Sequence, residues 1–182
     1  MTKKEQDKKL NQILMDLRAS DDKLVAHALK SLEIHGSSKA IKPLAQRLME
    51  PLSDKNKVDL IELLCSLKDS SARVELMDVI ADGSFLPIRN ELLTAVWNMK
   101  VDFSDYTAEF VEIAVKGDFM EALECLTIIE NLEGPFMEED ILESQLHLKN
   151  YLESTEPKDE QKAQLISEIA IRIKDINQQL TD

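Results

Sequence analysis

Apolar residues recur along the chain at spacings of three and four, which is the period of an amphipathic α-helix. Leu10, Ile13, Leu14 and Leu17 form the first such stripe, and comparable stripes follow almost to the last residue. Residues that start or stop helices separate one stripe from the next. After the first stripe, the pattern predicts helices over residues 20–35, 37–50, 53–69, 70–83, 86–100, 104–117, 118–134, 137–154 and 157–180.

Several residues predict where individual helices begin and end. Ser20 or Asp21 suits the N-cap of the second helix, and Gly36 suits its end. Ser53, Ser104 and Asp118 are the N-caps predicted for three later helices, and Pro157 occupies the first position of the last one. Pro43 lies inside the third predicted helix, so that helix either starts late or bends there.

The apolar stripes repeat with a period near 33 residues, which is the signature of a stacked helical array. Shifts of 33, 34 and 30 residues superimpose apolar positions of successive helices. For the first helix of each pair, these positions are Val25, Ala28 and Leu32; Val58, Ile61 and Cys65; Leu92, Ala95 and Met99; and Ala122, Cys125 and Ile129. For the second helix they are Ile41, Leu44 and Leu48; Val74, Met77 and Ala81; and Ala108, Val111 and Val115.

One stretch, "ALKSLEIHGSSKAIKPLAQRL", resembles the short bacterial (PBS-lyase-like) form of the HEAT repeat. In that pattern a first helix ends near a glycine, and Ala-Ile-x-Pro-Leu opens the second helix; these positions are Gly36, Ala40, Ile41, Pro43 and Leu44. "LLCSLKDSSARVELMDVI" follows the pattern more loosely and has no proline. The resemblance covers residues 20–83 well and 84–133 weakly. Tetratricopeptide repeats have a similar period, but their Trp, Gly and Tyr positions are missing from the first helices.

The resemblance implies an all-α, right-handed α-α solenoid of the armadillo type, with about four HEAT-like helical hairpins. We expect a single domain over residues 1–182, with a capping helix at 1–19, repeats at 20–152 and a C-terminal capping helix at 153–182. Stacked hairpins bury the apolar faces that one hairpin would expose. The last helix has a wide apolar stripe, which suits either a closing helix or a helix that pairs with a second chain.

Composition favours an acidic partner-binding protein over a nucleic-acid-binding one. The chain has 22 basic and 35 acidic residues, a net charge of −13, and residues 118–156 contribute −10 of it. Phosphate backbones are bound mainly by Lys and Arg, so we expect no nucleic acid. The acidic segment is either a solvated face or a patch that steers a partner with a basic surface. No stretch reaches the roughly 18 apolar residues of a membrane span, and "MTKKEQDKKL" is no secretory signal. We therefore expect a cytoplasmic protein that does not bind membranes.

The residues that usually carry catalysis or bind metals are scattered. Cys65 and Cys125 fit reduced core thiols. His35 suits the C-terminus of a helix, and His27 has no Cys, His or Asp four residues away. Glu143 with His147 makes only two candidate metal ligands. Phosphate-binding, nucleophile-elbow and zinc-protease motifs do not occur in the sequence. We therefore predict no catalytic, cofactor or metal site, and no enzyme.

Aromatic residues are concentrated in the middle of the chain, where seven of the eight lie between Phe85 and Phe136. On a helical wheel, Trp97 and Leu93 lie nearly opposite the Leu92, Ala95 and Met99 stripe. They either pack on a neighbouring hairpin or form an exposed binding hot spot, for which Trp is the most typical residue. Phe103 is positioned as a hydrophobic staple for the next helix, and Tyr106 and Phe110 lie four residues apart on that helix.

These observations predict a non-enzymatic interaction scaffold, monomeric or weakly dimeric, that binds a protein through a pre-formed surface. The residues predicted to bind the partner are Leu93, Trp97, Tyr106, Glu130 and Glu133. One alternative is a structural subunit that oligomerises through its C-terminal helix. HEAT-like enzymes of the DNA glycosylase or bilin lyase kind are further alternatives, but they need a basic groove or a polar pocket. The sequence does not identify the partner.

Overall fold

The chain folds into helices and turns in the computed structural model, which describes residues 3–35, 37–66, 70–99 and 101–181. No strand occurs within these ranges, and the predicted all-α class is confirmed. The α-helices described are α1 (Lys3–Leu17), α2 (Asp22–His35), α3 (Ile41–Leu48), α4 (Asp54–Ser66), α5 (Ser70–Ala81), α6 (Arg89–Asn98), α7 (Thr107–Lys116), α8 (Phe119–Glu130), α9 (Glu138–Glu153) and α10 (Glu160–Thr181). Short 3₁₀ helices, η1 (Ser38–Ala40), η2 (Gly83–Ile88) and η3 (Ser104–Tyr106), precede α3, α6 and α7.

The helices form two compact units, residues 1–101 with α1–α6 and residues 102–182 with α7–α10. The single domain stays a prediction. Charge is divided very unevenly between the units. Residues 102–182 contain 20 acidic and 6 basic residues, a net charge of −14, whereas residues 1–101 contain 15 acidic and 16 basic residues, a net charge of +1. The second unit therefore carries the whole negative excess of the chain.

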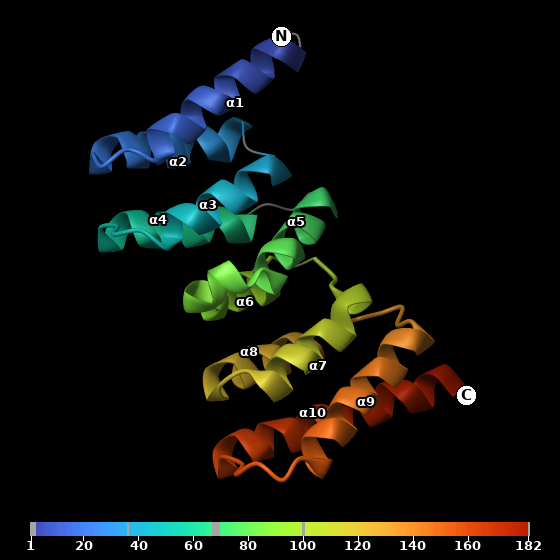
Figure 1. The fold of residues 1–182 in the computed structure, drawn as a ribbon. Helices are drawn as coiled ribbons and strands as arrows, with labels where there is room; N and C mark the ends of the chain where they lie inside the picture. Colours follow the sequence, from blue (N-terminus) through green and yellow to red (C-terminus); the bar gives the residue numbers. More distant parts are fainter. Residues whose placement is uncertain (1–2, 36, 67–69, 100, 182) are drawn as a thin grey trace. The chain divides into compact units, whose positions relative to one another are not determined.

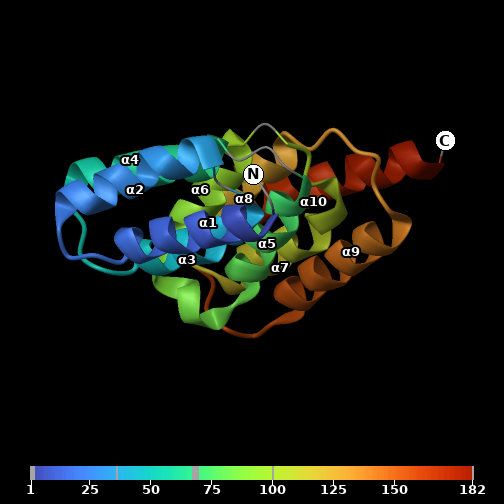
Figure 2. The same ribbon diagram turned by 90° about the horizontal axis from the view of Figure 1, so that it is seen from above.

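In residues 1–101, α1 packs on α2, α3 on α4 and α5 on α6 (Figure 1). α2 also packs on α4 and α4 on α6, while α1 packs on α3 and α3 on α5. Viewed from above, α2 and α4 therefore share one side, and α1 and α3 share the other (Figure 2). The predicted hairpins joined α2 to α3 and α4 to α5. The observed pairing is shifted by one helix, because the turn at 18–21 folds α2 back onto α1.

The predicted helix starts in this unit are largely confirmed. Asp21 is the N-cap of α2, since its carboxylate accepts a 2.8 Å hydrogen bond from the Lys23 amide. Pro43 is tolerated because α3 begins at Ile41, so the proline lies in the first turn, where its missing N–H has no helical partner. The late start is thus the correct alternative. Gly36, the predicted end of α2, lies outside the described residues.

The predicted core of α2 is confirmed, but the repeat phase slips at the next copy. Val25, Ala28, Leu29 and Leu32 are all buried. In α4, Val58 is 53% exposed and Ile61 and Cys65 are only half-buried. The buried residues there are Leu60, Leu63 and Leu64, which a shift of 35 rather than 33 aligns with Val25, Ala28 and Leu29. Val74 and Ala81 in α5 are also exposed, although Met77 is buried.

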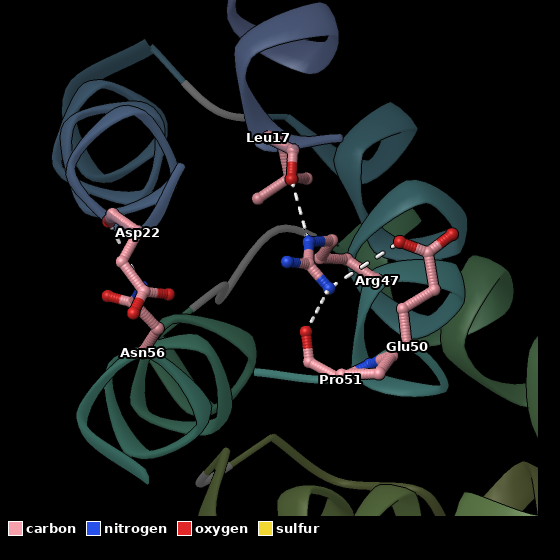
Figure 3. A network of polar contacts seen from close by, with 6 residues as sticks. All are labelled: Leu17, Asp22, Arg47, Glu50, Pro51 and Asn56. Carbon is pink, nitrogen blue, oxygen red and sulfur yellow. Dashed lines mark hydrogen bonds and ion pairs between the residues drawn. The ribbon is translucent and has the colours of Figure 1, made fainter. Parts of the chain in front are cut away.

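Polar side chains join the first hairpin to the second (Figure 3). The buried Arg47 side chain of α3 donates from Nε to the carbonyl of Leu17 at 2.9 Å and from Nη1 to the carbonyl of Pro51 at 3.0 Å. Asn56 of α4 donates from Nδ2 to both the backbone and side-chain oxygens of Asp22, at 3.1 Å each. The Arg47–Leu17 and Asn56–Asp22 hydrogen bonds each join the α1–α2 pair to the α3–α4 pair. Hydrogen bonds as well as apolar contacts therefore hold α1–α4 together.

In residues 102–182, α7 packs on α8 and α9, and α10 packs on α8, α9 and α7. The core of α10 is a row of four isoleucines on one side of the helix, Ile166, Ile169, Ile173 and Ile176. α10 begins at Glu160 rather than Pro157, because Asp159 caps it by accepting a 2.7 Å hydrogen bond from the Lys162 amide. Ile171 and Leu180, also apolar, are exposed.

The start of α8 is a complete capping box. Asp118 accepts from the Glu121 amide at 2.9 Å, and Glu121 accepts from the Asp118 amide at 3.0 Å. The predicted Asp118 cap is therefore confirmed. Gly117 precedes it because a Cβ there would lie 2.1 Å from Glu121 Oε2 and 2.8 Å from the Ile113 carbonyl. Only glycine leaves room for the returning carboxylate.

The predicted cap at Ser104 has a different role. α7 begins at Thr107, and Ser104 is a buried residue of η3. Its hydroxyl donates to Asp102 at 2.7 Å and accepts from the Gly134 amide at 2.9 Å. Asp102 also accepts from the Glu133 amide at 3.2 Å. Ser104 and Asp102 therefore hold the loop after α8 against the start of η3.

Candidate functional site

Six carboxylates lie together where α7 packs on α9, and we call them the acidic face. η3 and α7 contribute Asp105, Glu109 and Glu112, and α9 contributes Glu139, Asp140 and Glu143. Asp105, Glu109 and Glu112 are spaced by four and three residues, which puts them in one row along η3 and α7. Asp140 and Glu143 are three apart and form the opposing row.

The carboxylates of the acidic face repel one another. Glu109 is an exposed residue, but partial desolvation raises its pKa, and the charges of Asp140, Glu143 and Glu112 raise it further. Burial likewise raises the pKa of Asp140, together with Asp105, Glu143 and Glu139. Among the described residues, no lysine or arginine forms an ion pair with Glu109 or Asp140. The centre of the face is therefore negatively charged without a cation of its own.

A lysine and a histidine lie at one end of the acidic face. Lys116 forms an ion pair with Glu112, and its hydrogen bond lowers the pKa of that carboxyl. His147 Nε2 lies 3.7 Å from Glu143 Oε1, at the spacing noted in the sequence. In the part of the chain that the structure describes, no three metal-ligating side chains come together. The arrangement suits an extended cationic surface better than a chelated ion.

The two predicted binding residues of α6 have different surroundings. Leu93 is fully buried, whereas Trp97 is 44% exposed. Of the two alternatives left open by the sequence, burial against neighbouring elements fits Leu93 fully and Trp97 only in part. A partner contact by Leu93 conflicts with its burial, since a buried side chain offers no surface to a second protein. Part of Trp97 is therefore accessible on α6.

The other predicted binding residues lie in the second unit. Tyr106 is half-buried at the end of η3, with its ring centroid 6.3 Å from that of Phe103. Phe103 is buried and packs edge-on to Phe110 at 6.3 Å. Because Tyr106 rather than Ser104 is the N-cap of α7, Phe103 lies three residues before the cap, and the predicted staple position is not met. Glu130 and Glu133 are exposed near the end of α8. They belong to the same acidic unit but not to the acidic face.

A pocket of about 920 Å³ lies at the C-terminal ends of α7 and α9, and Lys116 and His147 are part of its lining. The α7–α8 turn, the end of α9 and the α9–α10 loop line it, and Phe119 is at its edge. Its polar side chains include Tyr151, Lys158 and Lys162. Both ammonium groups lie over the Tyr151 ring, with Nζ 5.3 Å and 5.6 Å from its centroid for Lys158 and Lys162.

The two lysines cap helix ends. Lys162 Nζ donates to the carbonyls of Val115 and Gly117 at 2.8 and 2.6 Å, at the end of α7. Lys158 Nζ donates to the carbonyls of Leu152 and Ser154 at 3.1 Å each, at the end of α9. Helix C-termini attract cations, so these bonds stabilise the unit. Burial lowers the pKa of Lys162. The Tyr151 hydroxyl is buried and has no hydrogen-bond partner among the described residues.

The cysteines occupy unreactive surroundings. Cys125 is buried, and burial raises the pKa of the half-buried Cys65 thiol. A raised pKa disfavours the thiolate, which is the nucleophilic form. None of the described helices is both long and apolar enough to cross a membrane.

Sequence reasoning missed the acidic face and the lysine–tyrosine pocket. The spacing of Asp105, Glu109 and Glu112 marks one charged row, but only the packing of α7 on α9 places Asp140 beside it. Lys162 lies in the first turn of α10, whereas Lys158 precedes the Asp159 cap, so a helical spacing does not bring the two lysines together. Their carbonyl partners lie as far as 47 residues away and depend on the tertiary fold.

In comparisons with known proteins, no family model, no curated protein and no solved structure matches this chain. The resemblance to HEAT repeats therefore stays a prediction that rests on the residues quoted for it.

Proposed function

We propose that this protein is a non-enzymatic interaction module that binds a basic protein segment through the acidic face. The observation that carries the proposal is the meeting of Glu109 with Asp140 and Glu143, with no cation paired to Glu109 or Asp140 among the described residues. Repulsion between these groups is a cost in the free protein. A lysine- or arginine-rich partner removes that cost on binding, which adds to its affinity.

The charge of the whole unit supports the same partner. Residues 102–182 have a net charge of −14, against +1 for residues 1–101. Such a field steers cationic partners toward one part of the molecule and raises their association rate. It also disfavours nucleic acid as the ligand, and with it the DNA glycosylase-like alternative, because phosphate groups would be repelled.

We further propose that α1–α10 form a HEAT-like solenoid. Supporting this, links between successive helix pairs of residues 1–101 recur at spacings of 30 to 34 residues: Arg47 to Leu17, Asn56 to Asp22 and Lys57 to Glu91. In a stack of repeated hairpins, each hairpin contacts its neighbour, so equivalent contacts join residues about one repeat apart in the sequence. The exposed Trp97 is a second candidate contact, because Trp is enriched in binding hot spots.

The lysine–tyrosine pocket is the feature that most favours an enzyme of the bilin lyase-like kind, and the arrangement of its lysines argues against that alternative. Each ammonium already donates to two backbone carbonyls, which leaves it one further N–H. Both lysines of the pocket thus serve to cap the ends of α7 and α9. Binding through the acidic face remains the function that more observations support.

Titration with a fluorescent oligolysine peptide of about ten residues tests the proposal. Neutralising the face with Glu109→Gln, Asp140→Asn and Glu143→Gln is expected to weaken binding by at least about tenfold, and added salt should weaken binding to the wild type. The matched control is Glu160→Gln, Glu168→Gln and Asp175→Asn, which removes the same charge from exposed positions of α10.

Partners captured from native lysate then identify the physiological ligand. We expect basic proteins that the acidic-face variant no longer captures and the α10 control variant still does. A second pair of variants, Trp97→Ala and charge reversal at Glu130 and Glu133, tests the surface expected from the sequence. If the face variant and the α10 variant lose oligolysine affinity equally, binding reflects net charge alone and the acidic face is not the site.

A further inference from the structure

The lysine–tyrosine pocket adjoins the acidic face, because two of its lining residues contact carboxylates of that face. Lys116, in the lining, forms an ion pair with Glu112. His147, also in the lining, has its Nε2 atom 3.7 Å from Glu143 Oε1. A peptide that lies on the acidic face can therefore continue into the pocket without leaving the protein surface.

The pocket has the size and the apolar lining of a site that binds an aromatic side chain. Its volume of about 920 Å³ falls within the range of about 300–1,000 Å³ that is typical of ligand pockets. Val115, Tyr151 and Pro157 contribute apolar surface to the lining, and Phe119 at the edge is 37% exposed. A ring that enters the pocket therefore covers apolar surface that water reaches in the free protein.

The charges of the pocket favour an uncharged ligand group. Its lining contains three lysines and three carboxylates, the latter belonging to Asp118, Glu156 and Asp159. Asp118 and Asp159 are the N-caps of α8 and α10. With His147 neutral, the lining has no net charge, so it offers a charged ligand group little to offset the loss of its hydration. In this respect the pocket differs from the acidic face.

Two hydrogen-bond donors of the pocket remain available to a ligand. Lys158 Nζ and Lys162 Nζ each donate to two backbone carbonyls, which leaves one N–H on each ammonium group. Among the described residues, no carboxylate forms an ion pair with either lysine. A neutral oxygen at the tip of a ligand side chain would accept a charge-assisted hydrogen bond from one of them.

We propose that the basic segment bound by the acidic face carries a tyrosine whose side chain occupies the lysine–tyrosine pocket. This inference rests on the proposed function, because the acidic face supplies the rest of the binding surface. The phenol ring suits the apolar lining, and its oxygen accepts from the remaining N–H of Lys158 or Lys162. Tyrosine is also one of the residue types enriched in binding hot spots.

The distance between the face and the pocket predicts where the tyrosine lies in the partner. Glu109, at the centre of the face, precedes Lys116 by 116 − 109 = 7 positions in α7. Seven helical residues span about 10 Å, which an extended peptide covers in about three residues. The tyrosine is therefore expected about three positions from the lysine that lies beside Glu109.

Titration of the full chain with fluorescent peptides tests this inference. Each peptide has a block of about ten lysines, as in the test of the acidic face, followed or preceded by about two glycines and one terminal residue. With tyrosine as the terminal residue, one of the two orientations is expected to bind at least about tenfold tighter than with alanine. Phenylalanine in place of tyrosine should bind at least about threefold more weakly than tyrosine, because its ring has no acceptor.

Variants of the protein place the gain in the pocket. The gain is the ratio of the dissociation constants of the alanine and tyrosine peptides, measured for each variant. Phe119→Ala is expected to remove most of it, and so is Asn150→Trp, which fills the pocket from an exposed lining position. Met120→Ala is the matched control, because Met120 follows Phe119 on α8, is 47% exposed and does not line the pocket. It should keep the gain.

The inference and the proposed function fail in different ways. If the alanine peptide binds and tyrosine gives no gain in either orientation, the inference is overturned and the proposed function stands. The inference is also overturned if Phe119→Ala and Asn150→Trp keep the full gain, or if Met120→Ala loses as much of it as Phe119→Ala. If the alanine peptide does not bind, both are overturned.

Discussion

Arg47 and Leu17, 30 residues apart in the sequence, are joined by a 2.9 Å hydrogen bond from the guanidinium Nε to the backbone carbonyl. Only 5% of the Arg47 residue is exposed. The carbonyl belongs to the last residue of α1, where the helix dipole is negative and helical partners are missing. A buried cation is tolerated there because it supplies the donor that the helix end lacks.

Arg47→Ala is expected to lower the free energy of unfolding by about 2–4 kcal/mol, because it leaves buried carbonyls unpaired and removes packing. Arg47→Met should recover only the part due to packing. Urea denaturation followed by circular dichroism measures both. Arg18→Ala is the control: this exposed arginine contacts Gln46 at 3.4 Å, and its loss should stay within about 0.5 kcal/mol. Equal losses for Arg47→Ala and Arg18→Ala would contradict the role given to the buried guanidinium.

Two glycines differ in the space around them, which gives a paired test. Gly117→Ala is expected to cost about 1–2 kcal/mol, since the added Cβ displaces the Glu121 carboxylate and breaks the capping box. Gly83→Ala should change stability by less than about 0.5 kcal/mol, because a Cβ added there would have no neighbouring atom within 4 Å. Thermal denaturation of the two variants distinguishes them, and the explanation fails if they lose the same stability.

Ser104 connects the start of η3 to the loop after α8. Ser104→Ala removes its bond to Asp102 and leaves the Gly134 amide without its acceptor, so we expect a loss of about 1–3 kcal/mol. Ser167 is an exposed residue of α10 whose hydroxyl donates only to the Ala163 carbonyl, so Ser167→Ala should be nearly neutral. Chemical denaturation compares them, and a neutral Ser104→Ala would show that another group satisfies Gly134.

The acidic face predicts a dependence of stability on pH. The pKa values of Glu109 and Asp140 are raised in the folded protein, so the folded state binds protons more tightly than the unfolded chain. The free energy of unfolding therefore falls as pH rises from the unfolded pKa through the folded pKa. Glu109→Gln with Asp140→Asn should raise stability at pH 7 and have no such advantage below that window.

Glu112, in the same region, contributes to stability with the opposite dependence on pH. Lys116 lowers its pKa, so its contribution is present above the unfolded pKa and is lost as pH falls through the folded pKa. Glu112→Gln is thus expected to destabilise the protein slightly at pH 7 and to match the wild type in acid. Denaturation curves at a series of pH values measure both variants. If the stability of both variants, relative to the wild type, changed with pH in the same direction, the charge arrangement described for the acidic face would be wrong.

Features that depend on interactions between residues close in the sequence could be predicted from the sequence alone. The helical class, the Asp118 cap and the Val25 to Leu32 core stripe all follow from residues within about two turns of one another. The repeat phase failed at Val58 because a helix in a stack can be buried on more than one side, and apolar character alone does not say which residues face inward.

Features that depend on long-range packing were not predictable. Arg47 stands among Leu44, Ala45 and Leu48, and nothing nearby in sequence announces its acceptor at Leu17. Glu109 and Asp140 become neighbours only because α7 packs on α9. Trp97 and Leu93 share a side of α6 on the helical wheel, yet one is exposed and the other buried, since neighbouring elements cover that side only in part.

Lys162 completes the last turn of α7 by binding the carbonyls of Val115 and Gly117. The side chain that satisfies the carbonyls at the end of α7 therefore belongs to a residue that is synthesised 45 residues after Gly117. During synthesis, which proceeds from the N-terminus, α7 leaves the ribosome with those carbonyls still exposed to water. The second unit consequently reaches its final form only after the first turn of α10 has emerged, whereas Arg47 can reach Leu17 as soon as α3 has been made.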